Sequence, residues 1–154
     1  MNRQSDELYR ILLQKLEENG LRKTPQRLAV LKALAENPAH PNIGEIYQQV
    51  NKVLPMTSLA TVYKIVTALK EIGEVRELSL GEGGSHFDPV IGPPHPHLLC
   101  VECGKIVDAP VADLEALSHA AAKKTGYQIF DQQLDFFGLC PECQSKKKSR
   151  VTGK

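Results

Sequence analysis

The residues best suited to metal chemistry lie in one short stretch, from His86 to Asp108, which reads HFDPVIGPPHPHLLCVECGKIVD. This stretch contains three histidines, two aspartates and a Cys-x-x-Cys pair. No nucleophilic catalytic arrangement needs that mixture, whereas two metal sites that prefer ligands of different hardness would use all of it. We therefore expect two adjoining sites, one built from thiolates and one built from nitrogen and oxygen donors.

The thiolate site is predicted from the cysteines, which form two Cys-x-x-Cys pairs, Cys100/Cys103 and Cys140/Cys143. Two such pairs at this separation are typical of a four-thiolate tetrahedral zinc site, which stabilises a small domain without redox chemistry. A thioredoxin-like redox pair is the alternative. It requires a Cys-x-x-Cys that begins a helix, and we expect neither pair to lie in such a context.

The second site is predicted from four nitrogen and oxygen donors: Asp88, His95, His97 and Asp108. His95 and His97 are two positions apart, so on an extended chain both imidazoles face the same side. A mixed His and Asp set without thiolates suits Mn²⁺ or Fe²⁺ better than a structural zinc. His86 and His119 have no comparable neighbours in the sequence, and we expect both to be surface residues.

Composition is that of an ordinary globular protein. The 154 residues are 42% hydrophobic and 24% charged, without tryptophan and with few aromatic residues, so no aromatic nucleotide platform is indicated. No apolar run approaches the length of a membrane span, and the N-terminus mixes acids with bases, unlike a secretion signal. We therefore expect a cytoplasmic protein, in which paired cysteines more often hold metal than form disulfides.

Charge is distributed unevenly, although the formal net charge is only +1. From Leu21 to Lys70 there are seven Lys and Arg residues and two acids, a balance of +5. From Gly81 onward there are eight basic and nine acidic residues, a balance of −1. A basic N-terminal part favours nucleic-acid binding, with a solvated basic face as the alternative.

Hydrophobic periodicity and capping residues predict a winged helix-turn-helix domain over residues 1–88. The expected helices are Asp6–Glu18, Pro25–Glu36, Ile43–Val50 and Leu59–Ile72, and the expected strands are Val75–Leu80 and Ser85–Asp88. The fourth helix is apolar on one side and carries hydroxyls and lysines on the other, as a recognition helix for the major groove would. A helical bundle with a hairpin and no DNA binding is the alternative.

A linker rich in proline and glycine, residues 89–94, is predicted to separate this domain from a small α/β domain over residues 95–145. The expected elements there are strands His97–Cys100 and Lys105–Asp108, a helix Asp113–Lys124 and a strand Tyr127–Leu139. So small a domain is hardly self-sufficient, so pairing with a second copy is expected. The basic tail, residues 146–154, is expected to be disordered.

These motifs together resemble the ferric-uptake-regulator (Fur) family of metal-dependent transcriptional repressors over nearly the whole chain. The resemblance rests on Leu21–Arg27 (LRKTPQR), His40-Pro41, Ser58–Lys64 (SLATVYK), His95-x-His97-x-x-Cys100-x-x-Cys103-Gly104-Lys105 and Cys140-x-x-Cys143. It implies a homodimer that binds a double-stranded DNA operator, with an N-terminal winged helix and a C-terminal dimerisation domain. It also implies a structural zinc on the four cysteines and a regulatory metal between the domains.

Within the family the chain is most similar to the peroxide-sensing (PerR) branch. That resemblance implies a regulatory Fe²⁺ or Mn²⁺ on five ligands: His40, Asp88, His95, His97 and Asp108. It further implies that hydrogen peroxide, with Fe²⁺ bound, oxidises a ligand histidine, His40 or His95, after which the repressor releases DNA. The residues expected to contact DNA are Arg22, Ser58, Thr61, Tyr63, Lys64 and Arg76.

Three other functions would use some of the same residues. A repressor that reads only iron or manganese levels would share the ligands without the oxidation. A zinc-dependent hydrolase could use His95, His97 and Asp108 as an open set of metal ligands, but that leaves the basic helix Ser58–Lys70 without a role, and we expect no enzyme. A zinc-containing interaction module would show no salt-dependent affinity for duplex DNA.

Overall fold

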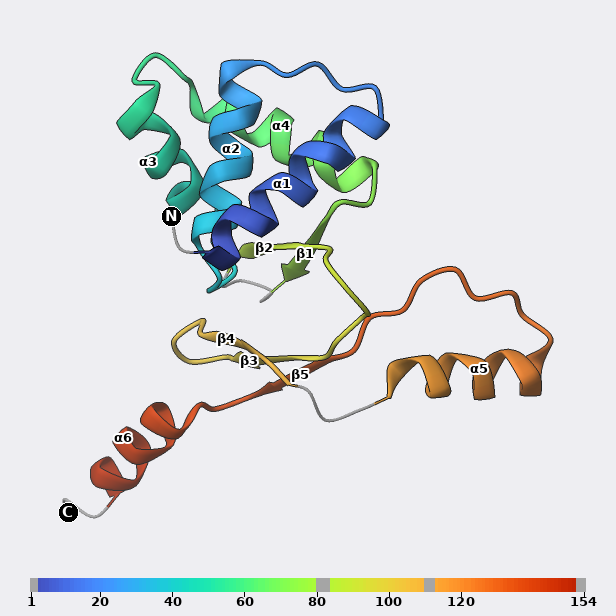
Figure 1. Cartoon of the computed structure of the whole chain (residues 1–154). Coiled ribbons are helices and arrows are strands. Elements are labelled where there is room, and N and C mark those ends of the chain that lie inside the picture. The colour runs from blue at the N-terminus through green and yellow to red at the C-terminus, as the bar shows by residue number, and fades with distance from the viewer. Residues whose placement is uncertain (1–2, 80–83, 110–112, 152–154) are drawn as a thin grey trace. The chain divides into compact units, whose positions relative to one another are not determined.

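The computed structural model describes residues 3–79, 84–109 and 113–151, which form two compact units (Figure 1). The first unit is Met1–Ile91 and the second is Gly92–Lys154. The α+β fold expected from the sequence is confirmed, with four helices and a hairpin in the first unit and a small α/β arrangement in the second. None of the described helices has the length and apolar character needed to cross a membrane.

Three of the four described helices of the first unit begin directly after a residue whose side chain caps them. The four helices are α1 (Arg3–Glu18), α2 (Pro25–Glu36), α3 (Ile43–Val53) and α4 (Leu59–Glu71). Thr24 accepts a hydrogen bond from the Arg27 N–H, and Asn42 forms a reciprocal capping box with Glu45. Such caps satisfy backbone donors that the first turn leaves without partners, which fixes where each helix starts.

Helix α2 lies at the centre of the first unit. It packs against α1, α3 and α4, and most of its apolar residues are buried. The core contains apolar side chains from every element of the unit, among them Leu12, Leu16, Leu31, Leu34, Ile46, Val50, Val62, Leu69, Val75 and Phe87. The helices gather on one side of the hairpin (Figure 1), and the hairpin closes the core with Val75 and Phe87.

The hairpin is made of β1 (Val75–Ser79) and β2 (Ser85–Pro89), paired antiparallel with Arg76 opposite Asp88. The other edge of β2 contacts the turn between α2 and α3. The N–H of Phe87 donates to the carbonyl of Pro41 at 3.0 Å, and Asn42 forms an isolated bridge with His86. Strand β2 therefore joins the hairpin to the loop that carries His40.

The second unit is built on a three-stranded sheet with β3 in the middle. The strands are β3 (His97–Cys100), β4 (Ile106–Asp108) and β5 (Asp135–Gly138), in the order β4-β3-β5. Strand β4 pairs antiparallel with β3, and β5 pairs parallel with it. Two helices complete the unit, α5 (Leu114–Thr125) and α6 (Pro141–Val151).

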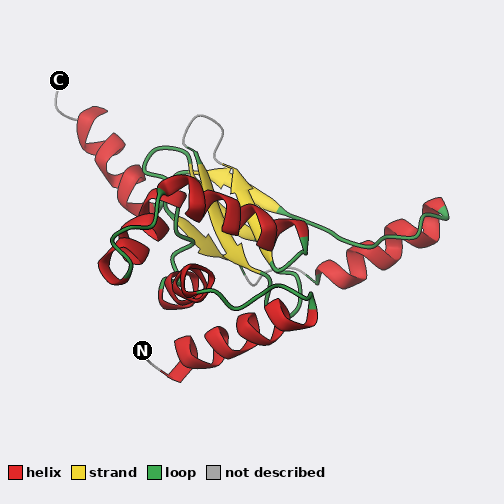
Figure 2. Ribbon diagram, turned by 90° about the horizontal axis from the view of Figure 1, so that it is seen from above, coloured by secondary structure: helices red, strands yellow, loops and turns green. Residues whose placement is uncertain are grey.

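The strand predicted from Tyr127 to Leu139 is wrong for most of its length. Gly126 ends α5 in the left-handed conformation, and the following chain has no regular structure until Asp135 (Figure 2). Tyr127 and Phe130 are 76% and 86% exposed. The β-forming residues are present, but no described strand pairs with this stretch, and pairing rather than propensity makes a strand.

The expectation of a disordered tail also differs from the structure. Helix α6 continues to Val151, and only residues 152–154 of that tail lie outside the described chain. Pro141 suits the first turn of a helix, and Glu142 is acidic in that turn. Low hydrophobicity alone had suggested disorder, but the helix begins at an anchored cysteine pair.

The two valines of α3 give a matched test of the core. Val50 is fully buried and Val53 is 59% exposed on the same helix. We expect Val50→Ala to lower the free energy of unfolding by about 2 kcal/mol, because two methyl groups leave a filled core. Val53→Ala should change it by less than about 0.5 kcal/mol. Urea denaturation followed by circular dichroism measures both, and equal effects would show that α3 does not pack as described.

Candidate metal centres

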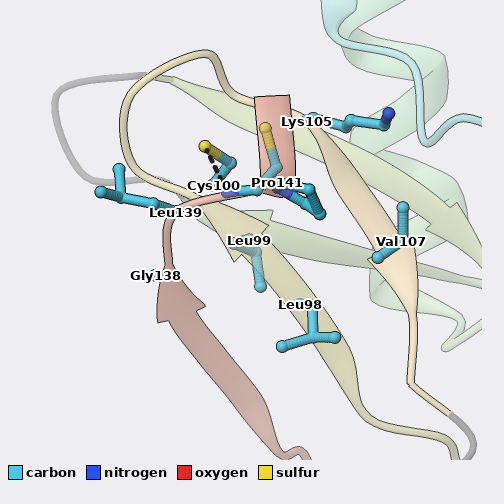
Figure 3. Close-up of a pocket in the computed structure, with 9 residues that line it drawn as sticks. Leu98, Leu99, Cys100, Lys105, Val107, Gly138, Leu139 and Pro141 are labelled. Atoms are coloured by element: carbon cyan, nitrogen blue, oxygen red, sulfur yellow. Dashed lines mark hydrogen bonds between the residues drawn. The ribbon is translucent and has the colours of Figure 1, made fainter. Parts of the chain in front are cut away.

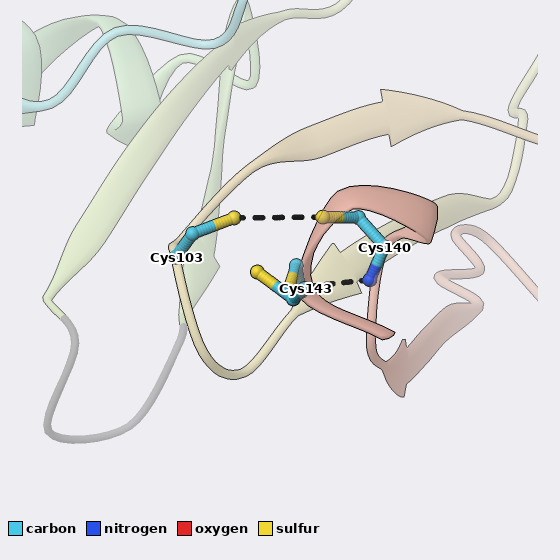
Figure 4. Close-up of side chains that lie close together, drawn as sticks. Cys103, Cys140 and Cys143 are labelled. Atoms are coloured by element: carbon cyan, nitrogen blue, oxygen red, sulfur yellow. Dashed lines mark hydrogen bonds between the residues drawn. The ribbon is translucent and has the colours of Figure 1, made fainter. Parts of the chain in front are cut away.

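The four cysteines converge at one end of the sheet in the second unit. Figure 4 shows three of them, Cys103, Cys140 and Cys143, close together. Their sulfur atoms all lie within 4.8 Å of one another, and the Sγ atoms of Cys103 and Cys140 are 3.8 Å apart. Cys100 ends β3 and Cys103 lies in the following turn, while Cys140 and Cys143 flank the start of α6. Lys105 pairs with Glu142 at 3.3 Å and so joins the two Cys-x-x-Cys segments a second time.

The cysteines differ in how readily they lose a proton. Backbone N–H groups of Cys140 and then Cys103 point at the Cys100 sulfur and lower the pKa of that thiol to about 6. The Cys140 sulfur beside Cys143, together with burial, raises the pKa of Cys143 to about 12. Without a cation among the sulfurs, Cys100 therefore loses its proton readily, whereas a negative charge on Cys143 is unfavourable.

This arrangement fits a zinc ion. Four convergent sulfurs without a nitrogen or oxygen donor are the ligand set of a closed structural site, and a divalent cation removes the repulsion between neighbouring thiolates. The four cysteines are free of disulfide bonds and could hold zinc as a set.

The premise that neither cysteine pair begins a helix is wrong. Cys140 lies directly before α6, and Pro141 is the first residue of the helix. A lone redox pair is nevertheless disfavoured by geometry, because the Cys140 sulfur lies 3.8 Å from the sulfur of Cys103, which belongs to the other pair. The rejection of a thioredoxin-like site therefore rests on convergence of both pairs and not on their local context.

An apolar hollow of about 200 Å³ lies beside the cysteine cluster (Figure 3). Leu98, Leu99, Val107, Leu139 and Pro141 supply most of its apolar lining. Across the strands, Leu98 is opposite both Val107 and Phe136, and these three side chains are 40–46% exposed. Leu98, Val107 and Phe136 thus form a continuous, partly exposed apolar row on the sheet face turned away from His97.

Strand β3 also places His97 between two carboxylates, since His97 is opposite Asp108 on β4 and opposite Asp135 on β5. Oδ1 of Asp108 lies 3.4 Å from Nε2 of His95 and 4.0 Å from Nε2 of His97. The two imidazole centroids are 4.8 Å apart. Two imidazoles and a carboxylate therefore meet at one end of β3, a donor set that suits Fe²⁺ or Mn²⁺.

Asp135 is a residue that the sequence analysis missed. Its Oδ1 lies 3.2 Å from Nδ1 of His97, within hydrogen-bonding distance, while Nε2 of the same ring lies on the side of Asp108. A carboxylate behind a metal-binding imidazole fixes its tautomer and its orientation. No sequence signal could have selected Asp135, because a parallel pairing of distant strands brings it to His97.

The first unit assembles the other two predicted ligands, His40 and Asp88. Nε2 of His40 lies 3.4 Å from Oδ1 of Asp88. His40 lies in the turn between α2 and α3 and has a positive φ of 55°, and Asp88 is on β2. The five predicted ligands therefore fall into two groups, each held together by its own unit.

The expectation that His86 is merely a surface residue is wrong. Its ring is half-buried on β2, and Nδ1 lies 2.6 Å from the carbonyl oxygen of His40. Its sequence position gave one unused signal, since residue 86 is two places before Asp88 on the same strand. His119, by contrast, is exposed on α5, as expected.

Most residues predicted to contact DNA are accessible on the first unit. Tyr63 and Lys64 are exposed on α4, and Arg22 is exposed before α2. The hydroxyl of Ser58 accepts from the Thr61 N–H at 3.1 Å and is 2.9 Å from the Thr61 hydroxyl, so it caps α4. Arg76 is half-buried on β1.

Comparison with known proteins gives a consistent set of relatives. The model of the ferric uptake regulator family matches residues 18–137. The peroxide operon regulator of Bacillus subtilis (strain 168) is 39% identical over 135 residues, 88% of this chain and 92% of that protein. The peroxide-responsive repressor PerR of Staphylococcus saprophyticus is 39% identical over 131 residues, covering 85% and 88%.

Solved structures agree on the fold. The Helicobacter pylori ferric uptake regulator, described as having three functional metal binding sites, superposes with a TM-score of 0.74 at 25% identity over 94% of this chain and 97% of that one. The Campylobacter jejuni peroxide stress regulator superposes with a TM-score of 0.68 at 35% identity, covering 85% and 98%.

The cysteine cluster predicts a specific loss of metal. We expect Cys103→Ser to abolish stoichiometric zinc, because three thiolates and a hydroxyl hold zinc poorly, and to lower the thermal unfolding temperature of the second unit. Elemental analysis and calorimetry measure the two effects. Glu102→Ser, in the same turn, is the matched control and should retain zinc. A full zinc content in Cys103→Ser would contradict the assignment.

Proposed function

Since the chain belongs to the ferric uptake regulator family, we propose that it is a dimeric, metal-dependent transcriptional repressor that senses hydrogen peroxide through a ligand histidine. The observation that carries this proposal is the division of the nitrogen and oxygen donors. His40 and Asp88 meet in the first unit, while His95, His97 and Asp108 meet in the second.

The donor set supports a regulatory Fe²⁺ or Mn²⁺. Three imidazoles and two carboxylates include no soft thiolate, and such ligands suit these ions more than a structural zinc. The second unit alone offers an ion three donors, and the first unit would add two further ligands, His40 and Asp88. Regulatory metal binding would therefore favour one arrangement of the two units over others.

Coupling to DNA follows from this preference. The first unit carries the helices expected to read DNA, and the second carries the exposed apolar row Leu98, Val107 and Phe136. Burial of that row against a second copy would give a dimer with two DNA-binding domains. An ion bound by both units would then favour one spacing of these domains. If that spacing matches the operator, metal binding raises the affinity for DNA.

The peroxide step is proposed for His40 or His95. Fe²⁺ held by these ligands would supply one-electron chemistry: it would give one electron to the O–O bond of hydrogen peroxide and take one back from the imidazole. In the net step, an imidazole C–H becomes C–OH with one peroxide oxygen, and the other oxygen leaves as water. The oxidised ring is a poorer donor, so the link between the units is lost and DNA is released.

DNA contact is proposed for the exposed face of α4 and its surroundings. Tyr63 and Lys64 are accessible for groove and backbone contact, and Thr61 lies one turn earlier at the start of α4. The Ser58 hydroxyl caps α4, so its proposed role is to place the first turn against a phosphate. Arg22 and Arg76 are proposed phosphate partners. We further propose that the protein acts in the cytoplasm, as a regulator and not an enzyme.

The direct test combines DNA binding with mass spectrometry. With Fe²⁺ loaded under anaerobic conditions, operator DNA selected from genomic fragments should be bound, and stoichiometric peroxide should release it. The released protein should carry one added oxygen on His40 or His95. Mn²⁺-loaded protein is the control and should stay bound. Oxidation confined to cysteine, or release without histidine oxidation, would favour a thiol mechanism or a repressor that reads metal levels only.

A conservative change at one ligand should separate metal binding from sensing. We expect Asp108→Glu to retain Mn²⁺-dependent DNA binding, because a carboxylate is still present, but to release DNA more slowly under peroxide, because the longer side chain alters the ligand geometry at His95. Gel shifts with Fe²⁺ and a peroxide series measure this. Wild-type sensitivity in Asp108→Glu would argue against a ligand role for Asp108 in sensing.

The recognition face predicts a salt-dependent loss. Lys64→Ala should weaken operator binding and reduce the slope of log affinity against log salt by about 1, because one phosphate contact is lost. Lys52→Ala, on α3, is the control and should leave the slope unchanged. Fluorescence anisotropy at several salt concentrations measures both variants. An unaltered slope in Lys64→Ala would remove this residue from the interface.

A further inference from the structure

The turn that carries His40 is held in an unusual backbone conformation. His40 has a φ of 55°, in the left-handed region. Among the described residues, every other residue with a positive φ is a glycine. Such a conformation is disfavoured for a side chain with a Cβ, and it persists where surrounding contacts determine it. The contacts made by this turn therefore decide where the His40 imidazole points.

Strand β2 supplies those contacts. Nδ1 of His86 donates to the carbonyl oxygen of His40 at 2.6 Å, and the next residue, Phe87, donates its N–H to the carbonyl of Pro41 at 3.0 Å. Asn42 bridges to His86 on the same edge. Two successive carbonyls of the turn are thus bound by two successive residues of one strand.

The same strand also carries the carboxylate that meets His40. Asp88 follows His86 by two positions, and its Oδ1 is 3.4 Å from Nε2 of His40. Side chains two apart on a strand face the same side. The His86 ring and the Asp88 carboxylate therefore hold His40 at its backbone and at its imidazole, respectively.

We propose that His86 is a positioning residue that holds His40 in the orientation required of a ligand to a divalent cation. This inference rests on the proposed function, because it concerns the same ion. His86 acts through its Nδ1–H and the His40 carbonyl and does not itself bind the metal. Its role requires a hydrogen-bond donor at the place of Nδ1 and nothing else of an imidazole.

Two substitutions of nearly equal size isolate that donor. His86→Asn places an amide NH₂ where Nδ1 lies, and His86→Leu has a similar volume without a donor. With zinc-loaded full-length protein and Mn²⁺ as the probe, we expect His86→Leu to raise the Mn²⁺ dissociation constant about ten-fold, as loss of an outer hydrogen bond to a metal ligand does. We expect His86→Asn to stay within about two-fold of wild type.

A second measurement separates positioning from a general loss of structure. After Fe²⁺ loading and peroxide treatment, the ratio of oxygen added at His40 to oxygen added at His95 should fall in His86→Leu and stay at the wild-type value in His86→Asn. Zinc content and thermal unfolding report whether either variant is damaged overall. His119→Leu, on exposed α5, is the control and should change none of these quantities.

The outcomes distinguish this inference from the function on which it rests. If wild-type protein shows no Mn²⁺-dependent DNA binding, the proposed function fails and the inference falls with it. If wild type responds to Mn²⁺ but His86→Leu binds it equally well, or His86→Asn loses as much affinity as His86→Leu, the proposed function stands and the role of His86 is overturned.

Discussion

The pairing of β3 with two strands at once is the contact on which the second unit depends. At one end of β3, Cys100 meets the cysteines that flank α6. At the other end, His97 lies between Asp108 and Asp135. A metal that ties Cys100 to Cys140 therefore also fixes the register of β5, and that register brings the Asp135 carboxylate to Nδ1 of His97. A thiolate site at the opposite end of β3 from His97 thus supports the orientation of that histidine.

Strand β2 has the equivalent role in the first unit. It closes the hydrophobic core with Phe87 on one face, and on its free edge it binds the turn that carries His40. Backbone pairing within each unit therefore positions the donors of that unit. The proposed regulatory ion would favour one arrangement of these two preformed groups. Metal binding would then select a conformation and would not have to build the site.

Much of this could be predicted from the sequence, and the exceptions share a physical cause. Capping residues such as Thr24, Asn42 and Ser58 act within one turn of helix, so the local sequence predicts where helices begin. The spacing of the two Cys-x-x-Cys pairs likewise predicts a zinc site. The failures concern distant pairing. The parallel contact of β3 with β5 brought in Asp135, the edge of β2 brought in His86, and the lack of a partner strand left Tyr127 and Phe130 exposed. Helix α6 was not predicted because its residues lack the apolar periodicity that indicates a helix, and residues 146–154 were expected to be disordered for the same reason.

We propose that a single ion takes ligands from both units, and an anomalous-scattering crystal structure of Mn²⁺-loaded, zinc-replete protein is the most direct test. We expect one manganese peak bonded to Nε2 of His40 and to the donors around His97, separate from a zinc peak at the four sulfurs. A manganese peak held by the second unit's residues alone, with the His40 imidazole remote from it, would show that the ion does not link the units.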